Sequence, residues 1–200
     1  MTDTLPKRMT RDARRLALLD AATAVLLADD RPAFTFETIA AQAGVSATLP
    51  YKYFESVDDV ADQLYHRVVD EVDEATDRLL ADPSRSFDDK VRSTLESWCD
   101  TIRQDGPLLL RLNEGVAHAS LARAIDRRRE RAIGVWATVL AAEFELDADD
   151  ARVVAASITA GSSATLQRWT RDGLDRGRAI ELFVRLARAQ AEAAAHHSTR

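Results

Sequence analysis

Side chains that can exchange hydrogen bonds with a polar or charged surface are concentrated between residues 35 and 53. Thr48 can hydrogen-bond the edge of a nucleotide base or touch a thymine methyl group. Lys52 can reach the acceptors of a guanine or a phosphate, and the hydroxyls of Tyr51 and Tyr53 suit phosphates. This is the chemistry of nucleic-acid binding. The candidate residues are Thr35, Thr38, Ser46, Ala47, Thr48, Tyr51, Lys52 and Tyr53.

Several of these residues also have a plainer interpretation. Thr35 and Ser46 are good helix N-caps, so capping alone explains them, although the backbone amides at a helix start also favour phosphate. Tyr53 and the adjacent Phe54 can be core residues, and this interpretation is the stronger one for Phe54. We favour nucleic-acid contact for Tyr51 and Lys52.

Local signals predict the elements that would position these side chains. Apolar residues at helical spacing predict a first helix over residues 10–28. Thr35 then caps a helix over residues 36–43, with Glu37 favourably placed in its first turn. Gly44 follows where a left-handed residue commonly ends a helix.

The next segment predicts a second short helix, which begins after the N-cap Ser46 and runs to Tyr53. Two short helices joined by a tight glycine turn form a helix-turn-helix. The combination resembles the TetR family of transcriptional regulators. The residues that carry the resemblance are Leu18-Leu19-Asp20-Ala21-Ala22, Thr35 to Ala43, Gly44-Val45-Ser46 and Tyr51-Lys52-Tyr53-Phe54.

The resemblance implies an all-α homodimer with two kinds of domain. The N-terminal three-helix domain, residues 10–56, would bind DNA. The C-terminal helical domain, residues 57–200, would dimerise and hold a small-molecule effector.

Two positions depart from the pattern of the family. Pro50 stands where members usually have leucine, and it removes one backbone hydrogen bond and favours a tighter, 3₁₀ turn. After Phe54 the chain reads Glu55-Ser56-Val57-Asp58, where members usually have Pro-Ser-Lys and an acidic residue. The lysine that commonly approaches a phosphate is therefore replaced by Val57.

The rest of the chain is also predicted to be helical. Apolar residues form a long stripe from Val57 to a stop before Pro83, and another helix begins at Ser86. We expect that helix to break at Gly106-Pro107, with further helices over 107–117, 119–144, 148–171 and 175–195. The uncharged stretch from Val153 to Gln167 is too short to span a bilayer and is interpreted as a buried helix.

The central helices carry apolar residues with a few polar groups, which is the composition of an ordinary small-molecule pocket. Plain core packing is the competing interpretation. We expect the effector to be apolar or amphipathic. The candidate pocket residues are Trp98, Ile102, Leu109, Asn113, His118, Trp136 and Leu140.

The last two helices combine small residues with a repeated apolar stripe. Small side chains allow helices to approach closely, so a twofold four-helix seam between two chains would bury both sets. Packing within one chain is the alternative. The candidate interface residues are Ala160, Ala164, Leu182, Phe183 and Leu186.

Composition limits the other classes of function. The formal net charge is −6, yet residues 1–56 balance seven basic against seven acidic side chains, and residues 1–19 are net basic. A basic arm on a neutral head can approach DNA in one orientation. The single cysteine, Cys99, favours a reducing cytoplasm, and the N-terminus shows no apolar signal-peptide core.

The four histidines lie in no recognisable catalytic or metal motif, and we find no nucleophile elbow or phosphate loop. We expect neither an enzyme nor a bound cofactor. The sequence thus predicts a ligand-responsive regulator of transcription, a homodimeric repressor at a palindromic operator. The alternative is a helical small-molecule-binding or interaction protein whose DNA-binding head has been weakened by Pro50 and Val57.

Overall fold

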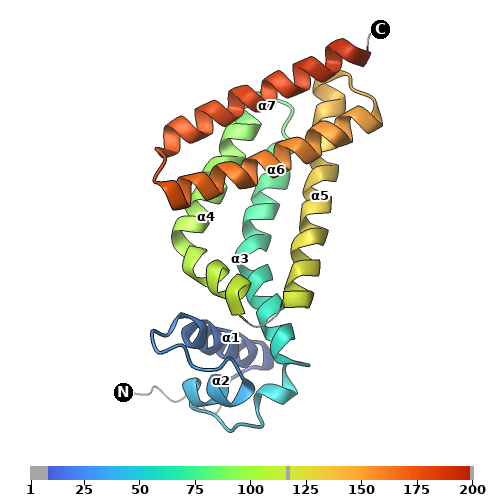
Figure 1. The fold of residues 1–200 in the computed structure, drawn as a ribbon. Helices are drawn as coiled ribbons and strands as arrows, with labels where there is room; N and C mark the ends of the chain where they lie inside the picture. Colours follow the sequence, from blue (N-terminus) through green and yellow to red (C-terminus); the bar gives the residue numbers. More distant parts are fainter. Residues whose placement is uncertain (1–8, 116–117, 199–200) are drawn as a thin grey trace. The chain divides into compact units, whose positions relative to one another are not determined.

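The structure, a computed structural model, describes the backbone of residues 9–115 and 118–198 and the side chains of residues 9–112 and 121–196. These residues form seven α-helices and one 3₁₀ turn, with no strand among them (Figure 1). The predicted all-α fold is confirmed. In chain order the elements are α1 (Arg11–Leu27), α2 (Phe36–Gln42), η1 (Pro50–Lys52), α3 (Val57–Leu80), α4 (Phe87–Gly115), α5 (His118–Phe144), α6 (Ala148–Asp172) and α7 (Arg176–Ser198).

Contacts divide the chain into two compact units. Unit 1 comprises the described part of residues 1–69 together with 105–124. Unit 2 comprises residues 70–104 and the described part of 125–200. The division falls within α3, α4 and α5, so each of these helices contributes residues to both units. The expected boundary between residues 56 and 57 stays a prediction.

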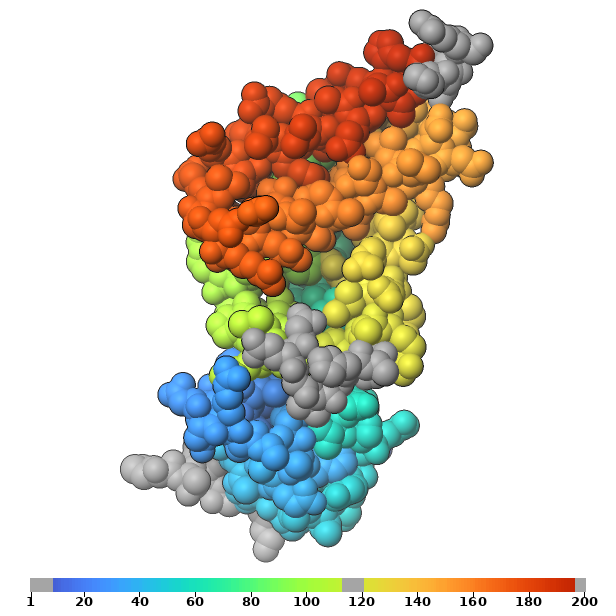
Figure 2. Space-filling model, viewed as in Figure 1, coloured from blue at the N-terminus to red at the C-terminus, as the bar shows by residue number. Residues whose placement is uncertain are grey.

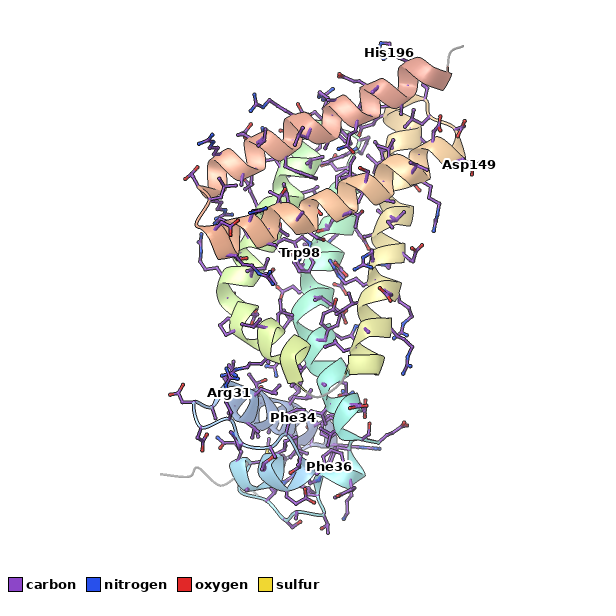
Figure 3. The ribbon with its side chains drawn as sticks, in the orientation of Figure 1. Arg31, Phe34, Phe36, Trp98, Asp149 and His196 are labelled. Atoms are coloured by element: carbon purple, nitrogen blue, oxygen red, sulfur yellow. The ribbon has the colours of Figure 1, made fainter. Side chains whose placement is uncertain are left out.

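Unit 1 is organised by α1 and α2. The Thr10 hydroxyl caps α1 by accepting a hydrogen bond from the Ala13 backbone N–H at 3.2 Å. The buried face of α1 then packs with α2 around large apolar side chains, among them Phe34 and Phe36, which Figure 3 labels. The core residues of this head are Leu18, Leu19, Ala22, Val25, Phe34, Phe36, Ile39 and Phe54.

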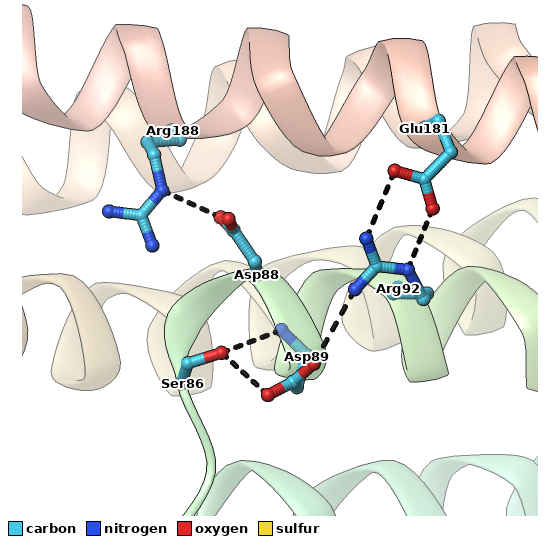
Figure 4. A network of polar contacts seen from close by, with 6 residues as sticks. All are labelled: Ser86, Asp88, Asp89, Arg92, Glu181 and Arg188. Carbon is cyan, nitrogen blue, oxygen red and sulfur yellow. Dashed lines mark hydrogen bonds and ion pairs between the residues drawn. The ribbon is translucent and has the colours of Figure 1, made fainter.

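Unit 2 has its own apolar core, and polar contacts join the start of α4 to α7 at its edge (Figure 4). Arg92 on α4 binds both carboxylate oxygens of Glu181 on α7, at 2.8 and 3.0 Å. One turn earlier, Asp88 accepts a hydrogen bond of 2.7 Å from Arg188. Ser86 contacts Asp89 at 2.6 Å, which stabilises the first turn of α4.

The predicted helix break at Gly106-Pro107 is wrong. Proline removes one backbone donor, which costs ~3 kcal/mol inside a helix. Even so, α4 continues through Pro107 to Gly115. Leu108 and Leu112 are buried just beyond the proline, and each buried leucine contributes about 1.5–3 kcal/mol, which is enough to keep the helix intact.

α6 is not the buried helix that its uncharged sequence suggested. One face carries the buried residues Ala151, Val154, Ala155 and Ile158. The opposite face is exposed, and Val153 retains 70% of its accessible surface. Asp147 is the N-cap of α6, and Gly173 ends the helix in the left-handed conformation at φ 65°. Among the described residues, no helix combines the length and the apolar composition needed to cross a membrane.

Candidate functional site

The start of α2 is held by a reciprocal pair of threonines. The Thr38 backbone N–H donates to the Thr35 hydroxyl at 3.3 Å, and the Thr35 backbone N–H donates to the Thr38 hydroxyl at 3.1 Å. Thr35 is therefore the N-cap that the sequence predicted. The Thr38 hydroxyl also lies 2.7 Å from the carbonyl oxygen of Ala33. Both threonines are half-buried and engaged in local hydrogen bonds, so their contact with phosphate stays a prediction.

The turn after α2 has the left-handed glycine that the sequence predicted. Gly44 has a φ of 65°, in the left-handed region that a side chain disfavours. The backbone N–H of Val45 then donates to the carbonyl of Ala40 at 3.0 Å, which closes the end of α2. This turn redirects the chain into the segment that carries most of the candidate DNA contacts.

That segment is not the short α-helix expected between Ser46 and Tyr53. It consists of two successive tight turns, the second being the 3₁₀ turn η1. Pro50 has no N–H to donate to the Ser46 carbonyl, and the Leu49 N–H donates to it instead at 2.9 Å. Lys52 in turn donates to the Leu49 carbonyl at 3.0 Å. The 3₁₀ tightening that Pro50 favours is thus confirmed for residues 50–52.

The side chains on this segment separate into an outer and an inner set. Ala47, Thr48, Tyr51 and Lys52 are exposed, as the sequence analysis placed them. Tyr53 is half-buried and Phe54 is 4% exposed, so the core interpretation of Phe54 is confirmed.

Ser46 does not act as the predicted N-cap. Its exposed hydroxyl lies 3.3 Å from the hydroxyl of Thr48, and the turn that follows has no side-chain cap. Two hydroxyls are therefore paired on the outer face of the segment.

The exposed Tyr51 is fixed against α2. Its ring meets the buried ring of Phe36 edge-on, with centroids 4.6 Å apart and planes at 75°. The neighbouring carboxyl of Glu37 has a lowered pKa, because it accepts hydrogen bonds from its own backbone N–H, from the Thr35 hydroxyl and, to a smaller extent, from the Tyr51 hydroxyl. Glu37 lies in the first turn of α2, where its sequence position predicted a favourable charge.

The charge of this face is not basic. Between residues 35 and 56, Lys52 is opposed by Glu37 and Glu55. Just beyond, Val57 is half-buried at the first position of α3, and Asp59 accepts a hydrogen bond of 3.0 Å from the Glu55 backbone N–H. Lys7 and Arg8 of the basic arm lie outside the described residues.

The candidate pocket residues have different surroundings. Trp136 and Leu140 are buried in the core of unit 2, where the Trp136 ring meets that of Phe87 edge-on at 6.0 Å. Trp98, Ile102 and Leu109 are half-buried. The side chains of Asn113 and His118 lie outside the described residues.

Trp98, which Figure 3 labels, has a charged neighbour that the sequence analysis did not identify. The guanidinium of Arg128 lies 4.1 Å from the centre of the Trp98 ring. The same guanidinium binds both carboxylate oxygens of Asp73, at 2.7 and 2.8 Å. In the described parts of the chain, no group of three or more acidic, histidine or cysteine side chains could hold a metal ion.

α6 and α7 run antiparallel, and Figure 2 shows their outer surfaces side by side on one face of unit 2. Leu182 and Leu186 on α7 remain 46% and 50% exposed, and Ala160 and Ala164 on α6 are also exposed. Phe183 differs from these candidates, because its ring is buried against Gly161 of the same chain.

Comparison with known proteins extends these observations. No family model matches the chain. A curated relative, the HTH-type transcriptional activator FasR of Mycolicibacterium smegmatis, is 26% identical over 184 residues, which cover 90% of this chain and 84% of the relative.

Two solved structures share the arrangement of helices. One is a TetR-like transcriptional regulator from Rhodococcus sp. RHA1, with a TM-score of 0.68 and 22% identity over 90% of this chain and 96% of that one. The other is a transcriptional regulator from Pseudomonas aeruginosa, with a TM-score of 0.73 and 19% identity over 96% of this chain and 97% of that one. The chain therefore has the fold of the TetR-family transcriptional regulators, the family that its helix-turn-helix segment resembles.

Proposed function

We propose that this chain is a ligand-responsive, DNA-binding regulator of transcription. The observation that carries the proposal is the exposed set of Ala47, Thr48, Tyr51 and Lys52, which follows the left-handed turn at Gly44 in the fold of a known class of regulators. These side chains belong to a segment whose backbone groups form hydrogen bonds with one another. Their groups can reach base edges and phosphates.

The regulator acts as a homodimer on a palindromic operator. The outer face of α6 and α7 supports this, since Val153 is 70% exposed, Leu182 and Leu186 are 46% and 50% exposed, and Ala160 and Ala164 are exposed too. Burying such a surface against a second copy is favourable at about 25 cal/mol per Å² of apolar area. A twofold pair would present two heads to two half-sites.

A small apolar or amphipathic molecule, bound among the central helices, releases the protein from DNA. Such a molecule shifts the equilibrium only by binding one spacing of the two heads better than the other. The half-buried residues that could contact this molecule are Trp98, Ile102 and Leu109. Two other candidates, Trp136 and Leu140, are buried in the core of unit 2.

Repression is the direction of control that we propose, through occupation of the operator. The curated relative is named as an activator. A reporter behind the bound site, with and without the protein, distinguishes the two directions.

The test of DNA binding is selection of bound fragments from random double-stranded DNA, followed by fluorescence anisotropy with the enriched sequence. We expect enrichment of a palindrome and tight binding by the dimer. Failure to enrich any sequence would contradict the proposal and favour a ligand-binding or interaction protein with a weakened head.

A further inference from the structure

Three exposed side chains follow one another at residues 46–48 of unit 1. They are the hydroxyl of Ser46, the methyl of Ala47 and the hydroxyl of Thr48. The two hydroxyl oxygens lie 3.3 Å apart, within hydrogen-bonding distance, and either of them can be the donor. The segment therefore presents a pair of hydrogen-bonding groups together with a methyl group.

The backbone on both sides of these residues is held by hydrogen bonds. The Val45 N–H donates to the Ala40 carbonyl at 3.0 Å, and the Ser46 carbonyl accepts from the Leu49 N–H at 2.9 Å. A segment that is already ordered loses less conformational freedom when it binds a partner. These side chains are therefore suited to recognising a fixed arrangement of chemical groups.

The pairing of the two hydroxyls determines what they offer to a partner. A serine or threonine hydroxyl has one proton and two lone pairs. When one hydroxyl donates to the other, the acceptor keeps its own proton for an outside partner, and the donor keeps its lone pairs. Whichever hydroxyl donates, the pair presents one donor beside one acceptor.

One base matches both members of this pair. In the major groove, adenine offers the N7 acceptor beside the N6 amino donor, whereas guanine offers two acceptors, cytosine one donor and thymine one acceptor. A phosphate would use only the donor of the pair, since its oxygens do not donate.

The methyl group distinguishes the two kinds of base pair. A G·C pair also places an acceptor beside a donor, on two different bases, but it carries no methyl group. An A·T pair carries the thymine methyl, which alanine side chains contact. The exposed methyl of Ala47 therefore favours A·T over G·C.

We propose that Ser46, Ala47 and Thr48 together recognise one A·T pair in each operator half-site. The paired hydroxyls bind N7 and the N6 amino group of adenine, and the Ala47 methyl contacts the thymine methyl. This inference rests on the proposed DNA-binding function and assigns a base pair to it. It differs from the sequence-based interpretation of Ser46 as an N-cap.

The experiment repeats the selection from random DNA with the full-length parent, the double variant Ser46→Ala/Thr48→Val and the control Thr138→Val. Removing both hydroxyls leaves neither without its partner, and both positions are exposed, so the helical content should not change. Thr138 is an exposed threonine of α5 in unit 2, and its substitution also replaces a hydroxyl by a methyl. Only the double variant should lose the preference for A·T at one position of each half-site.

Modified bases in the selected operator test each contact of the parent. Replacing the recognised A·T pair by G·C should weaken binding about five- to hundredfold. Replacing its adenine by 7-deazaadenine, which lacks the N7 acceptor, should weaken binding about two- to tenfold, because one neutral hydrogen bond is lost. Replacing its thymidine by deoxyuridine removes one methyl and should weaken binding about two- to fourfold.

The variants should lose these sensitivities selectively. The double variant should bind the adenine and 7-deazaadenine operators equally, and Ala47→Gly should bind the thymidine and deoxyuridine operators equally. If the double variant keeps the base preferences of the parent, or weakens on all sequences by the same factor, the inference is wrong while DNA binding stands. A parent that tolerates 7-deazaadenine at every adenine of the operator would also overturn it. If the parent binds no DNA, both proposals fail.

Discussion

Arg128 on α5 holds Asp73 on α3 through two hydrogen bonds of 2.7 and 2.8 Å, while its guanidinium stacks 4.1 Å from the centre of the Trp98 ring on α4. The guanidinium of Arg128 thus links α5 to both α3 and α4 within unit 2. Asp73 retains only 16% of its side-chain exposure. Loss of the cation would leave a largely buried carboxylate without its main partner.

Arg128→Met should therefore lower the free energy of unfolding by about 1–3 kcal/mol, the range for hydrogen bonds to charged groups. The measurement is urea denaturation followed by circular dichroism. Arg129→Met is the matched control, since Arg129 pairs with Asp126 at an exposed position and such pairs contribute at most about 1 kcal/mol. Equal losses in the two variants would contradict this account of Arg128.

Gly161 on α6 should tolerate no side chain. A Cβ at this position would lie 2.8 Å from Cε2 of Phe183, so Gly161→Ala should destabilise the protein by about 1–3 kcal/mol through overpacking. The helical Gly134 has open space around its Cβ position, and Gly134→Ala should stabilise by about 0.5–1 kcal/mol. Thermal unfolding of both variants measures the contrast. A stabilised Gly161→Ala variant would show that the Phe183 ring moves aside at little cost.

Leu186→Arg should convert a dimer into monomers, because it would bury an unpaired charge at the proposed twofold seam. Light scattering of the purified protein reports the mass directly. Leu16→Arg introduces the same charge at an exposed leucine of α1 and should leave the mass unchanged. A stable dimer of Leu186→Arg would place the interface elsewhere.

Tyr51→Ala and Lys52→Ala should each weaken binding to the selected operator and leave the helical content unchanged. A positioned base contact contributes about 1–3 kcal/mol, so the loss should be about five- to hundredfold. Arg78→Ala, which removes an exposed cation near the end of α3, is the control. Parent-like binding by both head variants would mean that the exposed face of η1 does not face DNA.

Val57→Lys restores the lysine of the family pattern at the start of α3. It should add one phosphate contact per subunit, so the slope of log affinity against log salt should steepen by about 1.8 for a dimer. A cation at a helix N-terminus is disfavoured by about 0.3–1 kcal/mol, so the free protein should become slightly less stable. Operator affinity at several salt concentrations tests this. An unchanged slope would mean that residue 57 faces no phosphate.

The sequence predicted several features that depend on neighbouring residues alone, although the local N-cap signal of Ser46 was wrong. Thr35 caps its helix, and Gly44 takes the left-handed conformation, because the relevant groups lie within a few residues. Pro50 tightened its turn for the same local reason.

Features that depend on distant partners were missed. α4 passes through Pro107 because buried leucines outweigh the lost hydrogen bond, and the exposed face of α6 depends on where the other helices lie. The contact of the Tyr51 ring on η1 with the Phe36 ring on α2 joins residues from two elements, and the turn between them brings the rings together. The spacing of apolar residues along the chain does not show which distant side chains will meet in the fold.

The division of α3, α4 and α5 between the two units has a consequence for biosynthesis. Residues 105–124 belong to unit 1, although residues 70–104 precede them and belong to unit 2. Domains that are continuous in sequence can fold one after another as they leave the ribosome. Unit 1 cannot be completed in this way, because its last segment emerges only after more than half of the chain has been translated. A nascent chain paused before residue 105 would therefore hold an incomplete unit 1, which chaperones could still bind.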